Sequence, residues 1–297
     1  MRIAVTGTKG QLVRSLHERA SKLTEVDLIL LGRPDVDLSW HESIGPALRD
    51  CGADLIINAA AYTEVDKAES EADAAFTINA GGAEAVASAA AQLGLPVIQI
   101  STDYVFDGTA SGSYPETAPT NPSSVYGASK LAGEAAVTAA NPHHLIIRTA
   151  WIYSPFGKNF VKTMLRLAGD RDTLSVVDDQ IGNPTSALDL ADGLLAAAHS
   201  VLQPDFDKWG IYNMAGSGST SWAGFAAHVL SESGHAGGPY AKIAPIPGSK
   251  FVTAAKRPSN SRLDCKKTER IFGYRAPDWR LSTSVVVKRL LAESGRP

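Results

Sequence analysis

The N-terminal half of the chain repeats one pattern: a short apolar run, a loop, and then a stretch with helical spacing. The runs DLILL at 27–31 and DLIIN at 54–58 are continuously apolar inside. Strands of this kind are buried on both faces and belong to parallel sheets covered by helices on both sides. The repeat therefore predicts an α/β fold with a doubly wound parallel sheet (Rossmann), in which ligands bind at the carboxyl ends of the strands.

The same pattern places the individual elements. It predicts strands at 2–6, 27–31, 54–58, 96–100 and 144–148. It predicts helices at 11–22, 43–49 and 123–139, with Ser43 as an N-cap, and one or two helices over 73–93. After about residue 150 the rhythm loosens, although GIYNM at 210–214 predicts a further strand returning to the sheet. We therefore expect a Rossmann domain over 1–150 and a smaller C-terminal lobe over 151–297.

Composition excludes several other classes of protein. The 297 residues are 44% hydrophobic, which is enough to bury a sizeable core. Their net charge of −3 disfavours binding to nucleic acid. Cys51 and Cys265 form neither a disulfide framework nor a metal-binding spacing, which favours a cytoplasmic setting. No signal peptide and no apolar run of about 20 residues is present, so we expect no contact with a membrane.

A glycine-rich turn, GTKGQLV at 7–13, joins the first strand to the first helix. Gly7 allows a tight turn, and Gly10 lets the backbone approach a pyrophosphate at the helix N-terminus. This position predicts dinucleotide binding and makes 1–150 the NAD(P)-binding domain. Val13 departs from the pattern, because many dinucleotide-binding folds place a third small residue there. An ordinary turn between strand and helix is the alternative.

The end of the second strand bears on the cofactor. An acidic residue there would bind the adenosine ribose of NAD, whereas this chain has Gly32 followed by Arg33. An arginine can pair with a 2′-phosphate, so Arg33 favours NADPH. Asp37 lies close enough along the chain to contact the ribose, which leaves NADH as the alternative cofactor. A solvated loop position is the alternative for Arg33.

Three further residues suggest reduction of a ketone. Tyr126 and Lys130 form a Tyr-x-x-x-Lys pair on one face of a predicted helix, and Thr102 ends the preceding strand. Hydride addition to a ketone leaves negative charge on oxygen, which then needs a proton. We expect Lys130 and a nicotinamide ribose to lower the tyrosine pKa by about 3 units from about 10, while Thr102 holds the oxygen. The predicted catalytic residues are Thr102, Tyr126 and Lys130.

In this order, these motifs resemble the extended short-chain dehydrogenase/reductases. More specifically, the chain resembles the dTDP-4-dehydrorhamnose reductases. The matching stretches cover nearly the whole chain: GTKGQL (7–12), NAAAYTEVDKAESE (58–71), STDYVFDG (101–108), VYGASKLAGE (125–134), RTAWIY (148–153), NF (159–160), MLRLA (164–168), DDQIGNPT (178–185) and KRPSNSRL (256–263).

The resemblance implies NAD(P)H-dependent reduction of the 4-keto group of dTDP-4-dehydro-6-deoxy-L-mannose to dTDP-L-rhamnose. The C-terminal lobe is then mainly substrate-binding. The expected cofactor contacts, with Arg33 from the strand end and Ile100 beside Thr102, are Gly7, Gly10, Gln11, Leu12, Arg33, Asp37, Leu38, Ala61, Tyr62, Thr63, Ile100, Tyr126 and Lys130. The expected substrate contacts are Thr102, Asp103, Trp151, Gln180 and Arg257.

The resemblance leaves other functions open. A nucleotide-sugar dehydratase or epimerase of the same superfamily is disfavoured, because the dehydratase needs Thr-Asp-Glu where this chain has Thr102-Asp103-Tyr104. A reductase of another nucleotide 4-keto sugar stays open. So does a non-catalytic regulatory subunit similar to that of methionine adenosyltransferase.

The resemblance also bears on metal binding and assembly. Some members of the family dimerise through a metal ion held by glutamates. The corresponding positions here are Ser15 and the neighbourhood of Leu188, which are not acidic. We therefore expect no metal ion and favour a monomer over a dimer.

Overall fold

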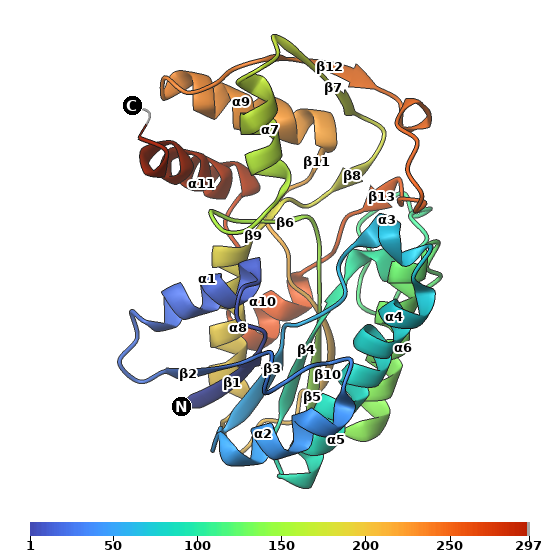
Figure 1. Ribbon diagram of the computed structural model, residues 1–297, viewed down its shortest axis with the longest axis vertical. Coiled ribbons are helices and arrows are strands. Elements are labelled where there is room, and N and C mark those ends of the chain that lie inside the picture. Colours follow the sequence, from blue (N-terminus) through green and yellow to red (C-terminus); the bar gives the residue numbers. More distant parts are fainter. Residues whose placement is uncertain (296–297) are drawn as a thin grey trace.

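Six parallel strands form the central sheet of the computed structural model, which describes residues 1–295 (Figure 1). Their order across the sheet is β10-β5-β4-β3-β1-β2. The bounds are β1 (Arg2–Thr6), β2 (Asp27–Leu31), β3 (Leu55–Asn58), β4 (Val97–Thr102), β5 (His144–Thr149) and β10 (Gly210–Asn213). The chain passes from β1 to β2 on one side and then to β3 on the other, so the topological switch point lies between β1 and β3. The predicted doubly wound sheet is confirmed.

Helices cover both faces of this sheet because its strands are apolar on both faces. Within β1, Ile3 and Val5 join the core beneath one set of helices, and Ala4 joins the core beneath the other. The first set is α1 (Gln11–Ala20), α8 (Ala187–Val201) and α10 (Lys266–Phe272). The second set is α2 (Ile44–Asp50), α5 (Ala83–Gln92) and α6 (Val125–Ala140). The sheet is therefore the middle layer of three.

The stretch at 73–93, predicted as one or two helices, forms two α-helices joined by a wider turn. It consists of α4 (Ala72–Phe76), the π-helical turn η2 (Thr77–Gly82) and α5. Within η2, the Asn79 amide accepts a hydrogen bond from the Tyr62 backbone N–H and donates to the Ser129 hydroxyl. These side-chain bonds compensate for the irregular backbone. Gly133 of α6 packs directly on the Asn79 carbonyl oxygen.

Ser43 occupies the predicted N-cap position of α2, but the expected capping hydrogen bond is absent. Ser43 does precede α2, but it ends the short helix η1 (His41–Ser43) and makes no capping hydrogen bond. Its hydroxyl instead donates to the Trp40 carbonyl at 2.7 Å and accepts from the Asp37 backbone N–H at 3.1 Å. Ser43 therefore braces the loop after β2 and does not stabilise the helix end.

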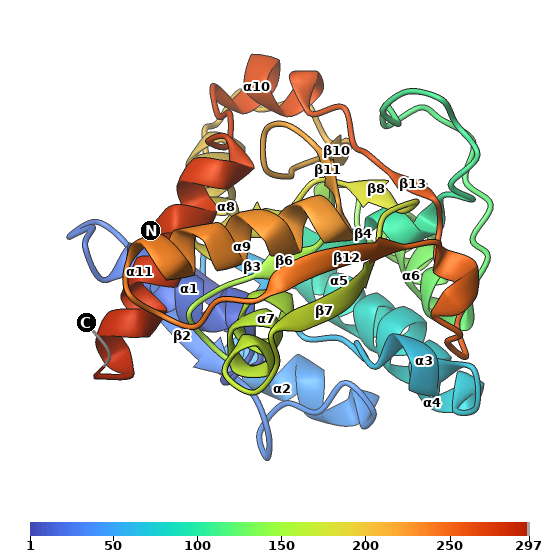
Figure 2. The same ribbon diagram turned by 90° about the horizontal axis from the view of Figure 1, so that it is seen from above.

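A second part lies above the carboxyl ends of the strands (Figure 1). Its core is formed mainly by α7 (Phe160–Ala168), α9 (Trp222–His235) and α11 (Trp279–Glu293), with the parallel pair β7 (Thr173–Val177) and β12 (Lys242–Ile246). Figure 2 shows α9 lying along this strand pair. One small sheet pairs β6 (Ile152–Tyr153) with β9 (Thr185–Ser186). In another, β8 (Ile181–Gly182) lies between β11 (Thr220–Ser221) and β13 (Asn260–Ser261).

The remaining elements are short. They are the helix α3 (Val65–Ala68) and the single turns η3 (Asp103–Val105) and η4 (Gly248–Lys250). Because α8, β10 and α10 pack with the central sheet, the C-terminal half contributes to both parts. Within residues 1–295, no helix is long and apolar enough to cross a membrane.

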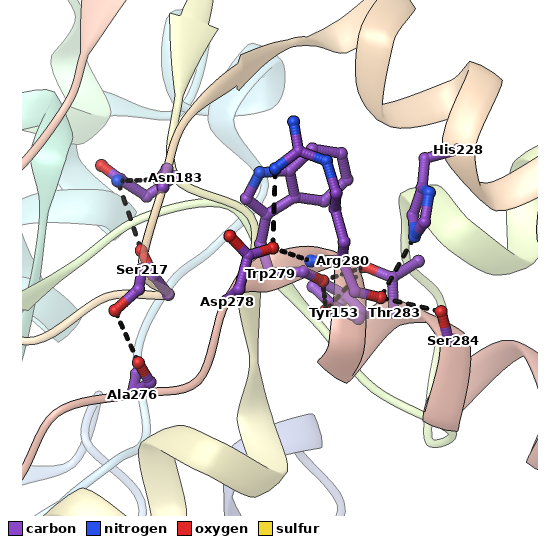
Figure 3. Close-up of polar contacts among 12 residues, drawn as sticks. Tyr153, Asn183, Ser217, His228, Ala276, Asp278, Trp279, Arg280, Thr283 and Ser284 are labelled. Carbon is purple, nitrogen blue, oxygen red and sulfur yellow. Dashed lines mark hydrogen bonds and ion pairs between the residues drawn. The ribbon is translucent and has the colours of Figure 1, made fainter.

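Polar contacts fasten the start of α11 to the second part (Figure 3). The Asp278 carboxylate caps the helix by accepting the Arg280 backbone N–H at 2.9 Å. The Tyr153 hydroxyl from β6 lies 2.9 Å from the Thr283 hydroxyl and donates to the Trp279 carbonyl at 3.3 Å. Because Tyr153 and Trp279 belong to the same hydrophobic core, these bonds fix α11 against β6 within the second part.

The contact between α6 and η2 gives a stability prediction. A Cβ atom on Gly133 would fall well inside the contact distance of the Asn79 carbonyl oxygen. Gly133→Ala must therefore push the two helices apart, and we expect it to lower the free energy of unfolding by about 1–3 kcal/mol. Gly45→Ala in α2 is the matched control, because a Cβ there meets nothing within 4 Å. Urea unfolding would contradict the packing argument if both variants lost stability equally.

Candidate active site

A cleft of about 1040 Å³ opens at the carboxyl ends of β1, β3 and β4, beneath the second part. Most of the site residues predicted from the sequence line it. They are Gly7, Gly10, Gln11, Leu12, Arg33, Asp37, Leu38, Ala61, Thr63, Ile100, Thr102, Asp103, Tyr126, Lys130 and Trp151. The structure therefore brings the glycine turn, the strand-end threonine and the Tyr-x-x-x-Lys pair into one cavity.

Three predicted residues lie outside the lining of this cleft. The Tyr62 hydroxyl donates to the Glu71 carboxylate at 2.8 Å. The Arg257 guanidinium donates two hydrogen bonds to the Asp66 carboxylate, at 3.1 and 2.7 Å. Gln180 lies in the loop between β7 and β8, close to Gly248. Their predicted ligand contacts stay predictions.

The glycine turn presents an open helix N-terminus to the cleft. Gly7 has φ +95°, a conformation that favours glycine, and its N–H donates to the Leu31 carbonyl at 2.6 Å. In the described chain, α1 has no side-chain cap and no acidic residue in its first turn. Its free N–H groups and positive dipole end are therefore available to an anion. Val13 is buried beneath the turn and contacts the Gly7 position, so a larger residue than expected fits there.

Gln11 connects this turn to the second part. Its side-chain oxygen accepts hydrogen bonds from the Ser154 hydroxyl at 2.8 Å and from the Asn159 amide at 2.9 Å. Asn159 in turn caps α7 by accepting the Lys162 backbone N–H at 3.1 Å. The glycine turn and the first helix of the second part are thus held by one hydrogen-bonded network.

A charged pair lies beyond β2. The Arg33 guanidinium is largely exposed and lies 3.4 Å from the Asp37 carboxylate. Hydrogen bonds from Ser39 and the charge of Arg33 hold the pKa of Asp37 below its ordinary value. At this corner of the cleft, the exposed Arg33 guanidinium can leave Asp37 and pair with another anion, whereas the Asp37 carboxylate stays ionised at neutral pH.

The start of α6 fixes Tyr126. Ser124 caps the helix by accepting the Gly127 backbone N–H, and the Glu69 carboxylate accepts the Val125 N–H at 2.8 Å. The Tyr126 ring meets Tyr104 edge-on, with 5.6 Å between the ring centroids. Burial raises the pKa of Tyr126 to about 12, although the neighbouring Thr102 hydroxyl opposes the shift. The phenol is therefore neutral near pH 7, the form that can donate a proton.

Lys130 lies one helical turn further on and is turned towards β4. Its ammonium donates to the Ile100 carbonyl oxygen at 2.6 Å. Burial lowers the pKa of Lys130 to about 8, and the negative charge of Glu134 opposes this. The expected lowering of the Tyr126 pKa is therefore not produced by these side chains alone, because burial dominates both groups.

Asp103 is a buried carboxyl with an open bonding position. Its Oδ1 accepts the Thr102 hydroxyl at 3.0 Å, while Oδ2 has no hydrogen-bond partner within residues 1–295. Burial raises the pKa of Asp103 to about 6. Buried polar atoms are normally paired, so Oδ2 is an exception among the buried side-chain atoms, and Asp103 itself is one of the residues that line the cleft.

Sequence reasoning did not assign a site role to three further lining residues, Tyr104, Lys158 and Trp222. Trp222 stacks on Trp151 with 3.5 Å between the ring centroids. Tyr104 belongs to the stretch STDYVFDG and could have been found from that motif. Trp222 belongs to no motif, and nothing in the local sequence signals its contact with a residue 71 positions earlier.

The prediction that the protein binds no metal ion can be compared with the arrangement of side chains that could hold one. Across residues 1–295, no three His, Cys, Asp or Glu side chains group together as metal ligands. Ser15 and Leu188 are both buried. The monomeric state and the absence of a metal ion stay predictions.

Known proteins share this sequence and fold. A family model described as the RmlD substrate binding domain matches residues 1–292. A dTDP-4-dehydrorhamnose reductase of Sinorhizobium fredii is 48% identical, with 99% of each chain covered. A crystal structure of such a reductase from Clostridium acetobutylicum superposes with a TM-score of 0.91 at 36% identity, covering 98% of this chain and 99% of that one. One from Bacillus anthracis in complex with NADP gives 0.88 at 35% identity, with the same coverage.

The buried carboxyl makes stability depend on pH. Because the folded-state pKa of Asp103 is raised to about 6, the contribution of this residue to the free energy of unfolding falls as the pH rises from about 4 to 6. Asp103→Asn removes this dependence. We expect the stability of the variant relative to wild type to rise by up to about 3 kcal/mol between pH 4 and 7, measured by urea unfolding.

Asp107→Asn is the control with the opposite sign. Hydrogen bonds from Thr109 lower the pKa of Asp107, so its contribution to stability is present at neutral pH and is lost as the pH falls. The relative stability of this variant should therefore decrease as the pH rises. Parallel pH profiles for the two variants would count against the raised pKa of Asp103.

Proposed function

The chain belongs to the dTDP-4-dehydrorhamnose reductase family, and on this premise we propose that it reduces the 4-keto group of dTDP-4-dehydro-6-deoxy-L-mannose to dTDP-L-rhamnose with NADPH. The observation that carries the proposal is the convergence of Thr102, Tyr126 and Lys130 in one cleft with the open N-terminus of α1. The first three suit proton transfer to a carbonyl oxygen, and the last suits a pyrophosphate.

The residues of the cleft fit a dinucleotide. The uncapped start of α1 and the backbone around Gly7 and Gly10 would hold its pyrophosphate, while Arg33 would pair with the 2′-phosphate. Small side chains at Ala59, Ala60 and Ala61 would let the cofactor lie against the end of β3. When bound, NADPH supplies the hydride.

Side chains of the protein would supply the proton that the reduced carbonyl oxygen needs. The Thr102 and Tyr126 hydroxyls would hold the sugar carbonyl oxygen, and Tyr126, which is neutral near pH 7, would donate its proton to that oxygen. Lys130 would then stabilise the phenolate by its positive charge. Trp151 and Trp222 would form an apolar wall that keeps water from the sugar ring.

Substrate recognition would draw on both parts of the molecule. The free Oδ2 of Asp103 would accept a sugar hydroxyl, beside Trp151. Gln180 and Arg257 would approach the nucleotide from loops of the C-terminal half. Arg257 would first exchange the carboxylate of Asp66 for a phosphate, which is also an anion suited to its guanidinium.

Two alternatives differ in what they predict for an assay. A reductase of another nucleotide 4-keto sugar would oxidise NADPH only with that sugar. A non-catalytic regulatory subunit would bind NADPH without turnover. The presence of Thr102, Tyr126 and Lys130 in one cleft favours an enzyme. We further propose that the protein acts as a monomer in the cytoplasm.

The direct test is NADPH oxidation followed by absorbance. The substrate is generated in situ from dTDP-glucose by the two enzymes that precede this step. We expect rapid oxidation that depends on the sugar and yields dTDP-rhamnose. Bound NADPH without oxidation would refute this substrate and turn attention to the two alternatives.

Tyr126→Phe tests the proton donor. The variant keeps the ring but lacks the hydroxyl, so we expect kcat to fall roughly 10²–10⁴-fold while NADPH still binds. Tyr104→Phe is the matched control, because it removes the hydroxyl of the ring packed against Tyr126. Near-normal turnover by the Tyr126 variant would remove this residue from the mechanism.

Arg33→Ala tests the cofactor preference. Without Arg33, the ionised Asp37 would repel the 2′-phosphate, so NADPH should bind roughly tenfold more weakly, while NADH changes less. Binding of both cofactors is measured by fluorescence titration. Equal weakening of the two would rule out the assignment of Arg33 to the phosphate.

A further inference from the structure

A buried carboxylate without a part in the chemistry above lies on the same helix as the reactive groups. Glu134 follows Lys130 by about one turn of α6, at the same spacing by which Lys130 follows Tyr126. Its side chain is 4% exposed. Burial of a carboxylate is costly unless the charge is paired and hydrogen-bonded, so the position of Glu134 calls for an explanation.

The contacts of Glu134 join three elements. The Arg148 guanidinium on β5 donates from Nε to Oε1 at 2.9 Å and from Nη2 to Oε2 at 2.6 Å. The Ser101 hydroxyl on β4 donates to Oε1 at 2.6 Å. Ser101 and Arg148 are register partners on adjacent strands. One carboxylate therefore ties α6 to two neighbouring strands of the sheet.

This tie lies directly beside the reactive residues. Lys130 donates to the carbonyl oxygen of Ile100, and the next residue of β4, Ser101, donates to Glu134. Two successive residues of the strand are thus bonded to α6, and Thr102 comes next. The placement of Thr102 relative to Tyr126 therefore depends on both bonds.

Glu134 also acts on the charge of Lys130. Burial lowers the pKa of Lys130 to about 8, and the carboxylate raises it again. Titratable and charged groups face this part of the site from α6 itself, from the turn after β4 and from β5. They are Tyr126, Glu134, Asp103, Tyr104 and Arg148. Glu134 is the member of this set whose negative charge supports a protonated lysine.

We propose that Glu134 is a positioning residue of the reductase: held by Arg148 and Ser101, it keeps Lys130 positively charged and keeps Thr102 in place opposite Tyr126. The kinetic part of this inference rests on the proposed function. The effect on Lys130 does not, because it can be measured without substrate.

Glu134→Gln removes the charge and keeps the shape. We expect the apparent pKa of Lys130 to fall by about one pH unit, because an opposite charge nearby is lost. The titration is followed by NMR of substrate-free protein labelled with ¹³C at the lysine Cε, and the signal is assigned by its loss in Lys130→Met. In the NADPH assay, the alkaline limb of the kcat profile should shift by the same amount towards lower pH, with a roughly fivefold loss of kcat at pH 8. Glu134→Asp keeps the charge and should restore the titration of Lys130.

Ser101→Ala separates geometry from charge. It removes the bond between β4 and Glu134 but leaves the ion pair with Arg148 intact. We expect kcat to fall roughly tenfold, the KM for NADPH to stay near that of wild type, and the titration of Lys130 to be unchanged.

Glu134→Gln leaves the Arg148 guanidinium buried without its charged partner, which can prevent folding. A second variant keeps the proposal testable in that case. Glu134→Gln combined with Arg148→Met removes both charges. It should also lower the pKa of Lys130, because the supporting carboxylate is gone.

Glu18→Gln is the matched control, because it breaks another carboxylate–arginine pair, to Arg289, outside the cleft lining. It should change neither kcat nor the titration of Lys130. The proposal is overturned if Glu134→Gln leaves the Lys130 titration at its wild-type position and matches Glu18→Gln in kcat. A wild-type protein that reduces no 4-keto sugar would refute the proposed function alone, since the titration of Lys130 needs no substrate.

Discussion

The packing of α6 against β4 is the contact on which the rest of the site depends. Strand β4 is buried along its whole length, and the helix side chains of Lys130 and Glu134 that meet it are buried as well. Such polar groups can occupy a dry interface only when each finds a partner. The Ile100 carbonyl and the Ser101 hydroxyl provide these partners from β4. The bonds that make burial tolerable therefore also fix how the helix lies against the strand.

The same burial sets the charge of the cleft. It raises the pKa values of Tyr126 and Asp103 and lowers that of Lys130, so each group is shifted towards its neutral form. A site of this kind responds strongly to any charge brought into it, since a low-dielectric environment screens little. The phosphates of a nucleotide would favour the charged lysine, as the carboxylate of Glu134 does within the chain. If Tyr126 donates a proton as proposed, an anion bound nearby would therefore favour this step by keeping Lys130 charged.

Much of this arrangement could be predicted from the sequence, because it depends on local patterns. Continuous apolar runs marked the five strands of the first half, and the turn at Gly7 needed a residue that adopts positive φ. The strand-end position of Thr102 follows from the predicted strand, and the spacing of Tyr126 and Lys130 puts both on one face of the predicted helix. The prediction that failed concerns a side chain whose hydrogen-bond partners are set by the tertiary structure. Ser43 has a residue type that favours capping, but its hydroxyl is bound to the loop after β2.

The contacts made by loops of the C-terminal half were harder still to predict from the sequence. Nothing near Trp222 indicates that it stacks on Trp151, and nothing near Arg257 indicates that Asp66 binds it. Both contacts arise because the chain crosses between the two parts of the molecule several times. Local propensity carries no information about such crossings, whereas the sheet that they rest on is encoded strand by strand.

This difference separates the reaction from the choice of substrate. Thr102, Tyr126 and Lys130 lie on elements of the sheet layer, where movement would disrupt the core. Arg257 lies on a loop, and the side chains of Arg257 and its partner Asp66 are 23% and 46% exposed, so solvent reaches and weakens their ion pair. This ion pair can therefore rearrange without disturbing the sheet layer on which Thr102, Tyr126 and Lys130 lie. If Arg257 binds the nucleotide as proposed, changes in its loop would alter recognition of the substrate while the proposed reactive groups stay in place.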